Sequence, residues 1–256
     1  MRKNFRKSAL AAMVAAAVAV GSYTAIPATP AEAGFGLGDI GKIAGIGGGG
    51  QVDIEGLTGR QNDLLTKLGY STLALSMARD DIQEAVGLGE ATEDLEAGQA
   101  ILSNAQGDAG ELTSFSKERL DSFGSKEDRK AKSAEIQGAL QEVIDSGDEE
   151  RLRKLDAVVK RAKTERLVSD GIVAAAAVDV VKIIKDAGSG IKSGGDLADQ
   201  FQQIMDTAKA AQQLLKVRSD VSSMLKTATK NYEKTRKIGE PSKEEKKAAE
   251  QSIRPE

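Results

Sequence analysis

The sequence predicts an all-α protein, and three observations support this prediction. All four prolines lie near the ends of the chain, so residues 31–240 contain none and are free to form long helices. Apolar residues in this stretch recur at intervals of three and four, which is the period of a helix. Alanine, leucine, lysine, glutamate and glutamine, which favour helix, are frequent there. We expect an elongated helical bundle built on a long C-terminal antiparallel αα-hairpin, with a long N-terminal helix and shorter helices packed on it.

The chain begins with the features of a cleavable secretory signal. A basic segment at residues 2–7 precedes an apolar run at residues 9–20, and an A-x-A cleavage motif ends at Ala33. The apolar run is about a dozen residues, shorter than the roughly 18 residues that span a bilayer. No cysteine follows the cleavage motif, which excludes a lipoprotein. We predict that residues 1–33 are a signal peptide, removed on export to the periplasm or the medium.

Composition restricts the classes of function. Removing residues 1–33 takes away four basic residues and Glu32, which leaves 32 basic against 38 acidic side chains. This mildly acidic balance does not favour nucleic-acid binding. The chain contains no cysteine, histidine or tryptophan, so it lacks the commonest general base, the strongest nucleophile and the usual zinc and haem ligands. We expect no catalytic residue, cofactor or metal.

Residues 34–50 form a glycine-rich leader. Glycine at this density costs too much backbone entropy for a stable isolated helix, so we expect a flexible segment. The alternative is that the Gly41-x-x-x-Gly45 pattern lets two helices approach closely in a membrane or an assembly.

The N-terminal helical region covers residues 51–146. Its first helix is expected from Asp53 to Val86, with apolar residues on one side and Gly87 after its end. Ser125 has the position of an N-cap for the last helix of the region. Between these lie shorter amphipathic helices, within residues 90–106 and 112–123.

The αα-hairpin is predicted over residues 147–238. Its first arm begins after the cap Asp148 and ends at Gly188-Ser189-Gly190, and its second arm runs from Asp196 to Ile238. Each arm has about 40 residues and would extend about 60 Å. Both arms have the 3-4 spacing of a coiled coil, with alanines that let the helices approach closely. Residues 51–238 are expected to form one domain.

Folding the two arms together brings Arg166 and Arg218 to one level, as a candidate polar layer in the seam. Facing arginines repel unless Glu165, Asp170 or Asp220 neutralises them, and such a layer would fix the register or mark a hinge. We favour the alternative that both side chains reach the surface while neighbouring valines fill the seam. Replacing both arginines with leucine would then leave helicity and melting unchanged.

The most apolar helical stretch after the signal lies between residues 172 and 184. A helix that is apolar on most sides needs more than one neighbour, which can be the N-terminal half, a second copy or a lipid surface. We treat its apolar members as a candidate interaction or buried segment: Ile172, Val173, Ala177, Val180 and Ile184.

Residues 239–256 form a charged tail. Pro241 and Ser242 have the pattern of a helix start, but the segment contains almost no apolar residue to anchor a helix. We expect a solvated, frayed end.

These features favour an exported, non-enzymatic helical protein of the cell envelope or periplasm that acts as an interaction, scaffold or structural module. Its partner would be another protein or a second copy of the chain. The alternative is a membrane-active protein, like the secreted helical pore-formers in its long helices, that brings residues 172–184 to a membrane surface. A lesser alternative is a carboxylate-dependent enzyme, for which the sequence shows no constellation of residues.

Overall fold

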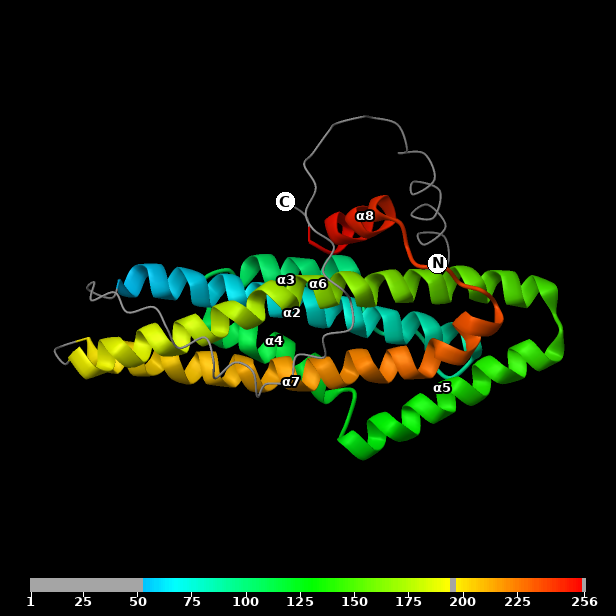
Figure 1. Ribbon diagram of the computed structural model, residues 1–256, viewed down its shortest axis with the longest axis horizontal. Coiled ribbons are helices and arrows are strands. Elements are labelled where there is room, and N and C mark those ends of the chain that lie inside the picture. Colours follow the sequence, from blue (N-terminus) through cyan, green and yellow to red (C-terminus); the bar gives the residue numbers. More distant parts are fainter. Residues whose placement is uncertain (1–52, 194–196, 255–256) are drawn as a thin grey trace. The chain divides into compact units, whose positions relative to one another are not determined.

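The computed structural model describes residues 53–193 and 197–254, which lie within one compact unit, Gly47–Glu256. The predicted signal peptide and the leader at residues 34–50 lie outside the described residues. The described part consists of α-helices without a strand, which confirms the all-α class. In chain order the helices are α2 (Ile54–Val86), α3 (Leu95–Asn104), α4 (Ala109–Asp121), α5 (Lys126–Ser146), α6 (Glu149–Ser193), α7 (Ala198–Thr235) and α8 (Lys243–Ile253) (Figure 1).

The three longest of the described helices, α2, α6 and α7, pack against one another (Figure 1). Near the start of α6, the Leu152 carbonyl accepts a hydrogen bond of 3.3 Å from the Tyr232 hydroxyl of α7. Near the end of α6, Gly190 lies against the ring of Phe201, in the first turn of α7. The start of α6 therefore lies beside the end of α7, and the end of α6 lies beside the start of α7, so the two helices are antiparallel.

Several helix ends follow from local sequence. Gly87 and Gly147 end α2 and α5 with φ of 81° and 65°, the left-handed conformation that glycine adopts without steric cost. Ser125 caps α5 in a reciprocal capping box with Asp128. The carboxylate of Asp148 accepts hydrogen bonds from two backbone N–H groups in the first turn of α6.

The predicted end of the first hairpin arm is wrong. Helix α6 continues through Gly188 and Gly190 to Ser193. A Cβ atom built at Gly190 would lie 2.6 Å from three atoms of the Phe201 ring. Glycine is therefore required at this position for a close approach of α7, and it does not mark a turn.

This packing gives a paired prediction for Gly188 and Gly190. Gly188→Ala is expected to raise the free energy of unfolding by up to about 1 kcal/mol, because alanine favours helix and no atom lies within 4 Å of the added Cβ. Gly190→Ala is expected to lower it by about 1 kcal/mol or more, because the clash with Phe201 outweighs that gain. Urea denaturation of both variants measures the difference. Equal effects at the two positions would contradict the close approach.

The predicted frayed tail is also wrong, because residues 243–253 form helix α8. Ser242 and Glu245 make a capping box at its start, and Ile253 at its end is only 2% exposed. The side-chain amide of Gln99 in α3 donates to the carbonyls of Ser252 and Ile253 at 2.6 and 2.9 Å. The apolar side of α8 consists only of Ala249 and its last residue, Ile253, which is too short a pattern to predict an anchored helix from the sequence.

Candidate functional site in the helical core

A layer of buried polar residues separates two clusters of apolar residues in the core. One cluster contains Val168 to Ala187 of α6, and the other contains Leu152 to Ala162. Between them, residues 163–166 are Lys, Thr, Glu and Arg, and each is less than 9% exposed. Four consecutive helical residues point in different directions. Helix α6 is therefore covered on all sides at this level.

Arg218 of α7 lies at the centre of the layer, with its side chain 4% exposed. Its Nε donates to the hydroxyl of Ser71 in α2 at 2.8 Å, and its Nη2 donates to the hydroxyl of Ser169 in α6. The two serine hydroxyls lie 2.8 Å apart, and that of Ser169 also donates to the Ser71 carbonyl at 2.9 Å. One guanidinium thus joins α2, α6 and α7.

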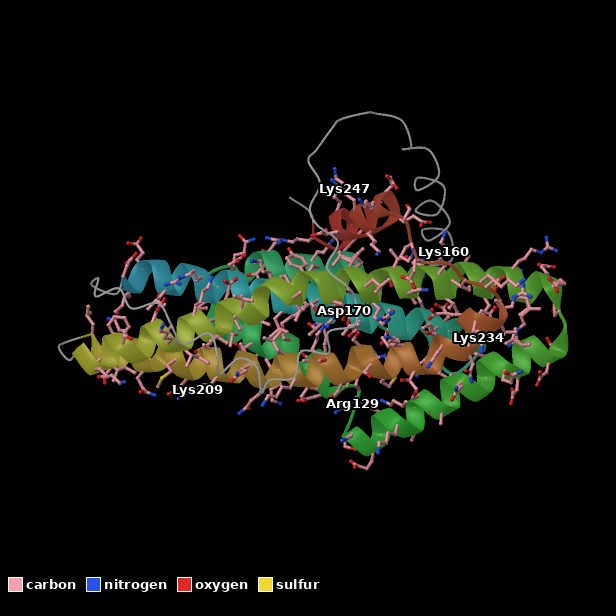
Figure 2. The ribbon with its side chains drawn as sticks, viewed as in Figure 1. Arg129, Lys160, Asp170, Lys209, Lys234 and Lys247 are labelled. Atoms are coloured by element: carbon pink, nitrogen blue, oxygen red, sulfur yellow. The ribbon has the colours of Figure 1, made fainter. Side chains whose placement is uncertain are left out.

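Asp170 of α6 neutralises this guanidinium. Its Oδ1 lies 2.6 Å from Nη1 of Arg218, and its Oδ2 lies 3.2 Å from Nη1 of Arg166. The hydroxyl of Ser222 in α7 donates to both carboxylate oxygens, at 2.9 and 3.2 Å. Figure 2 labels Asp170, which lies near the middle of α6.

The favoured expectation that both arginines reach the surface is wrong. Arg166 and Arg218 are 8% and 3% exposed, because helices on several sides enclose them. Of the three carboxylates considered from the sequence, Asp170 contacts both arginines. Asp220 instead lies 3.4 Å from Nη2 of Arg129 in α5. Burial lowers the pKa of Arg218, and Asp170 counteracts this shift through its charge and its hydrogen bond.

A second carboxylate of the layer, Glu165, is buried and faces α2. The pKa of Glu165 is raised to about 8, mainly by burial and also by the charge of Asp81, while Arg161 opposes the shift. Arg161 forms an ion pair with Oδ2 of Asp81, and its Nε lies 3.9 Å from Oε1 of Glu165. Two carboxylates therefore share one arginine.

Lys163, the first of the four buried polar residues 163–166, lies on the side of α6 that faces the C-terminal segment. Its Nζ lies 3.1 Å from Glu233 and 2.7 Å from Glu240. Burial lowers the pKa of Lys163, but the hydrogen bonds and charges of Glu240 and Glu233 outweigh this effect and raise it. The layer thus also contacts the segment that leads to α8.

The layer has little space for a substrate. A cavity beside it, lined by Lys163, Arg166 and Thr229 among others, has a volume of about 10 Å³. That is about the space of one water molecule. Within residues 53–193 and 197–254, no group of three or more acidic side chains is placed to hold a metal ion. The geometry suits the positioning of three helices.

A larger groove of about 300 Å³ lies at the starts of α2, α4 and α7. Its lining is uncharged: Ile54, Thr58, Gln61, Ala109, Gln200, Gln203, Ile204 and Thr207. Its threonine and glutamine side chains can form hydrogen bonds, but none of the lining side chains is an acid or a base at neutral pH.

The structure places the candidate apolar segment mainly in the core, where α2 and α7 contact α6. Ile172, Val173 and Val180 are 7%, 9% and 1% exposed, and Ala177 and Ile184 are half-buried. Val178, on the outward side, is 46% exposed. Among the helices described, none is both long and apolar enough to cross a membrane.

Sequence reasoning missed the serines that complete the polar layer. Ser71 lies three residues after Leu68 and four before Leu75, so it occupies a core position of α2. Ser169 has the same spacing between Arg166 and Val173. Small polar residues at core positions of separate helices were the available signal.

Comparisons with protein families, with curated proteins and with solved structures found no match to this chain.

Proposed function

We propose that this chain is an exported, non-enzymatic helical protein of the cell envelope that acts as an interaction or scaffold module. Its framework is the antiparallel hairpin of α6 and α7, with α2 packed along it. The observation that supports an interaction role is an apolar strip on the outward side of α6. We call Gly171, Ala174 and Val178 the outer strip.

The outer strip lies on residues 171–178 of α6, opposite the side on which Ile172 and Val173 pack in the core. All three of its residues are exposed, and their spacing of three and four aligns them along one side of the helix. Ala177 and Val181 beside them are half-buried, which widens the apolar surface. Small side chains let the backbone of another helix approach closely. The strip therefore suits a helical partner.

The polar layer supports the scaffold role. Arg218 has hydrogen-bonding partners on α2 and α6, so sliding either helix by one turn would separate buried charges from their partners. Buried polar groups of this kind fix the register of helices in coiled coils. The outer strip would thereby be presented on a rigid framework.

Export gives the first test of this proposal. The chain is expressed with a C-terminal tag in a bacterial host, and the tagged product is recovered from the periplasm and the medium. We expect a mature product whose N-terminus, measured by mass spectrometry, is Gly34. An Ala33→Leu variant, in which the cleavage motif is lost, is expected to retain residues 1–33. A full-length cytoplasmic product in both cases would contradict export.

Photo-crosslinking tests the interaction role. A photo-reactive amino acid at Val178 is expected to give a discrete protein adduct in the envelope of the native host. The same group at Lys226, an exposed position of α7, serves as the matched control. Adding Ala174→Glu should abolish the Val178 adduct, because a charge then lies within the apolar strip. Equal adducts at both positions would contradict a specific partner, and adducts with lipid would favour the membrane-active alternative.

A further inference from the structure

Helix α8 is held against the rest of the unit by one narrow side. Glu245, Ala249 and Ile253 are spaced by four residues and therefore lie along this side. Ile253 is buried in the core, Ala249 packs beside it, and the rest of the helix is largely exposed. Figure 1 shows α8 alongside α6, and α8 contacts α6 and α2 and is hydrogen-bonded to α3.

The surface beneath α8 provides a partner for the acidic residue near its start and for the polar groups at its end. Nζ of Lys160 in α6 lies 2.6 Å from Oε1 of Glu245, and Figure 2 labels this lysine. The amide of Gln99 in α3 binds the two carbonyls that end α8. Asp63 of α2 lies 4.0 Å from Nη2 of Arg254. We call this surface on α2, α3 and α6 the seat.

The attachment of α8 is weak compared with that of the core helices. Lys160 and Glu245 are 47% and 43% exposed, so their ion pair contributes little and is screened by salt. Within α8, Ile253 is the one buried residue, and the half-buried Ala249 packs beside it. The connection to α7 is anchored by the ion pair of Glu240 with Lys163 and by the buried Pro241, so only the helix beyond Pro241 is weakly held. Such a helix can leave its seat while the core stays folded.

We propose that α8 is an exchangeable latch, and that its seat is a docking site for a partner helix with an acidic, a small and a branched apolar residue at spacings of four. Lys160 would pair with the acidic residue of the partner, and the apolar core position that Ile253 fills would take its branched residue. Recognition of an amphipathic helix through anchors on one side is a common mode of protein interaction. The proposal rests on the interaction role proposed above, but it concerns a surface separate from the outer strip.

The test uses a fluorescent peptide with the sequence of residues 240–254 and the full mature chain. In Ile253→Glu, a carboxylate would have to enter the core, so α8 leaves the seat open. We expect the peptide to bind this variant at least tenfold more tightly than the wild-type chain, whose own α8 competes at a high effective concentration. Fluorescence anisotropy measures the binding. A peptide that itself carries Ile253→Glu is expected to bind at least tenfold more weakly.

A charge exchange provides an independent check that does not require Ile253→Glu to fold normally. A chain with Lys160→Glu should bind a peptide that carries Glu245→Lys more tightly than the original peptide, whereas the wild-type chain should show the opposite preference. Equal binding of the peptide to the wild-type chain and to Ile253→Glu, or binding to neither, would overturn the proposal. Self-association of the wild-type chain in light scattering that is lost in Ile253→Glu would overturn the choice of a separate partner, because the α8 of a second copy would then fill the seat. Loss of the Val178 adduct leaves this result unchanged, so the two proposals can fail separately.

Discussion

Asp170→Ala is expected to lower the free energy of unfolding by about 3 kcal/mol. The carboxylate of Asp170 is the counter-ion of Arg218, whose side chain is 4% exposed. Removing it leaves a buried guanidinium without a compensating charge, which typically costs about 3–5 kcal/mol. We expect the lower end of that range because Asp170 itself is 37% exposed, so water replaces part of what is lost. Urea denaturation followed by circular dichroism measures the change.

Asp220→Ala is the matched control on α7. Its carboxylate is 61% exposed and lies 3.4 Å from Arg129, so its loss should cost less than about 1 kcal/mol. Arg218→Met should be milder than Asp170→Ala, because Asp170 keeps Arg166 and Ser222, and Ser71 and Ser169 still bond to each other. If Asp170→Ala and Asp220→Ala cost the same, the layer does not depend on a buried ion pair.

Local signals in the sequence were enough for the helical class and for several helix ends. Gly87, Gly147 and the caps at Ser125 and Asp148 act through residues within one turn, so no knowledge of the tertiary structure was needed. The helix end predicted at Gly188-Ser189-Gly190 was wrong because it depends on a distant contact. Gly190 serves the approach of α7, a contact that no local pattern reveals.

The burial of the two arginines could not be derived from two helices alone. In a hairpin of α6 and α7, Arg166 and Arg218 would have an open side toward water, and the surface interpretation was reasonable. Helix α2 closes that side and brings Ser71 to Arg218. The sequence predicted α2 as a helix, but its alignment against α6 and α7 depends on packing over the whole length of these helices.

Glu165 is expected to make the protein less stable as the pH rises from about 4.5 to 8. Burial raises the pKa of Glu165 to about 8 in the folded chain, against an ordinary value of 4.5. Between these values the folded state holds one more proton than the unfolded state, so each pH unit lowers the free energy of unfolding by about 1.4 kcal/mol. Below this window both states are protonated, and above it neither is, so the dependence ends at both limits.

Glu165→Gln isolates this contribution, because glutamine resembles the protonated carboxyl group in size and in the absence of charge. The variant and the wild type are expected to be similarly stable near pH 4.5. At pH 8.5 the variant should be more stable by several kcal/mol, on the order of 4, because it has no proton to lose. Glu142→Gln, at an exposed position of α5, should follow the wild-type profile. Parallel profiles for the wild type and Glu165→Gln, from urea denaturation at each pH, would show that Glu165 is ionised in the folded chain, and that Arg161 neutralises both Glu165 and Asp81.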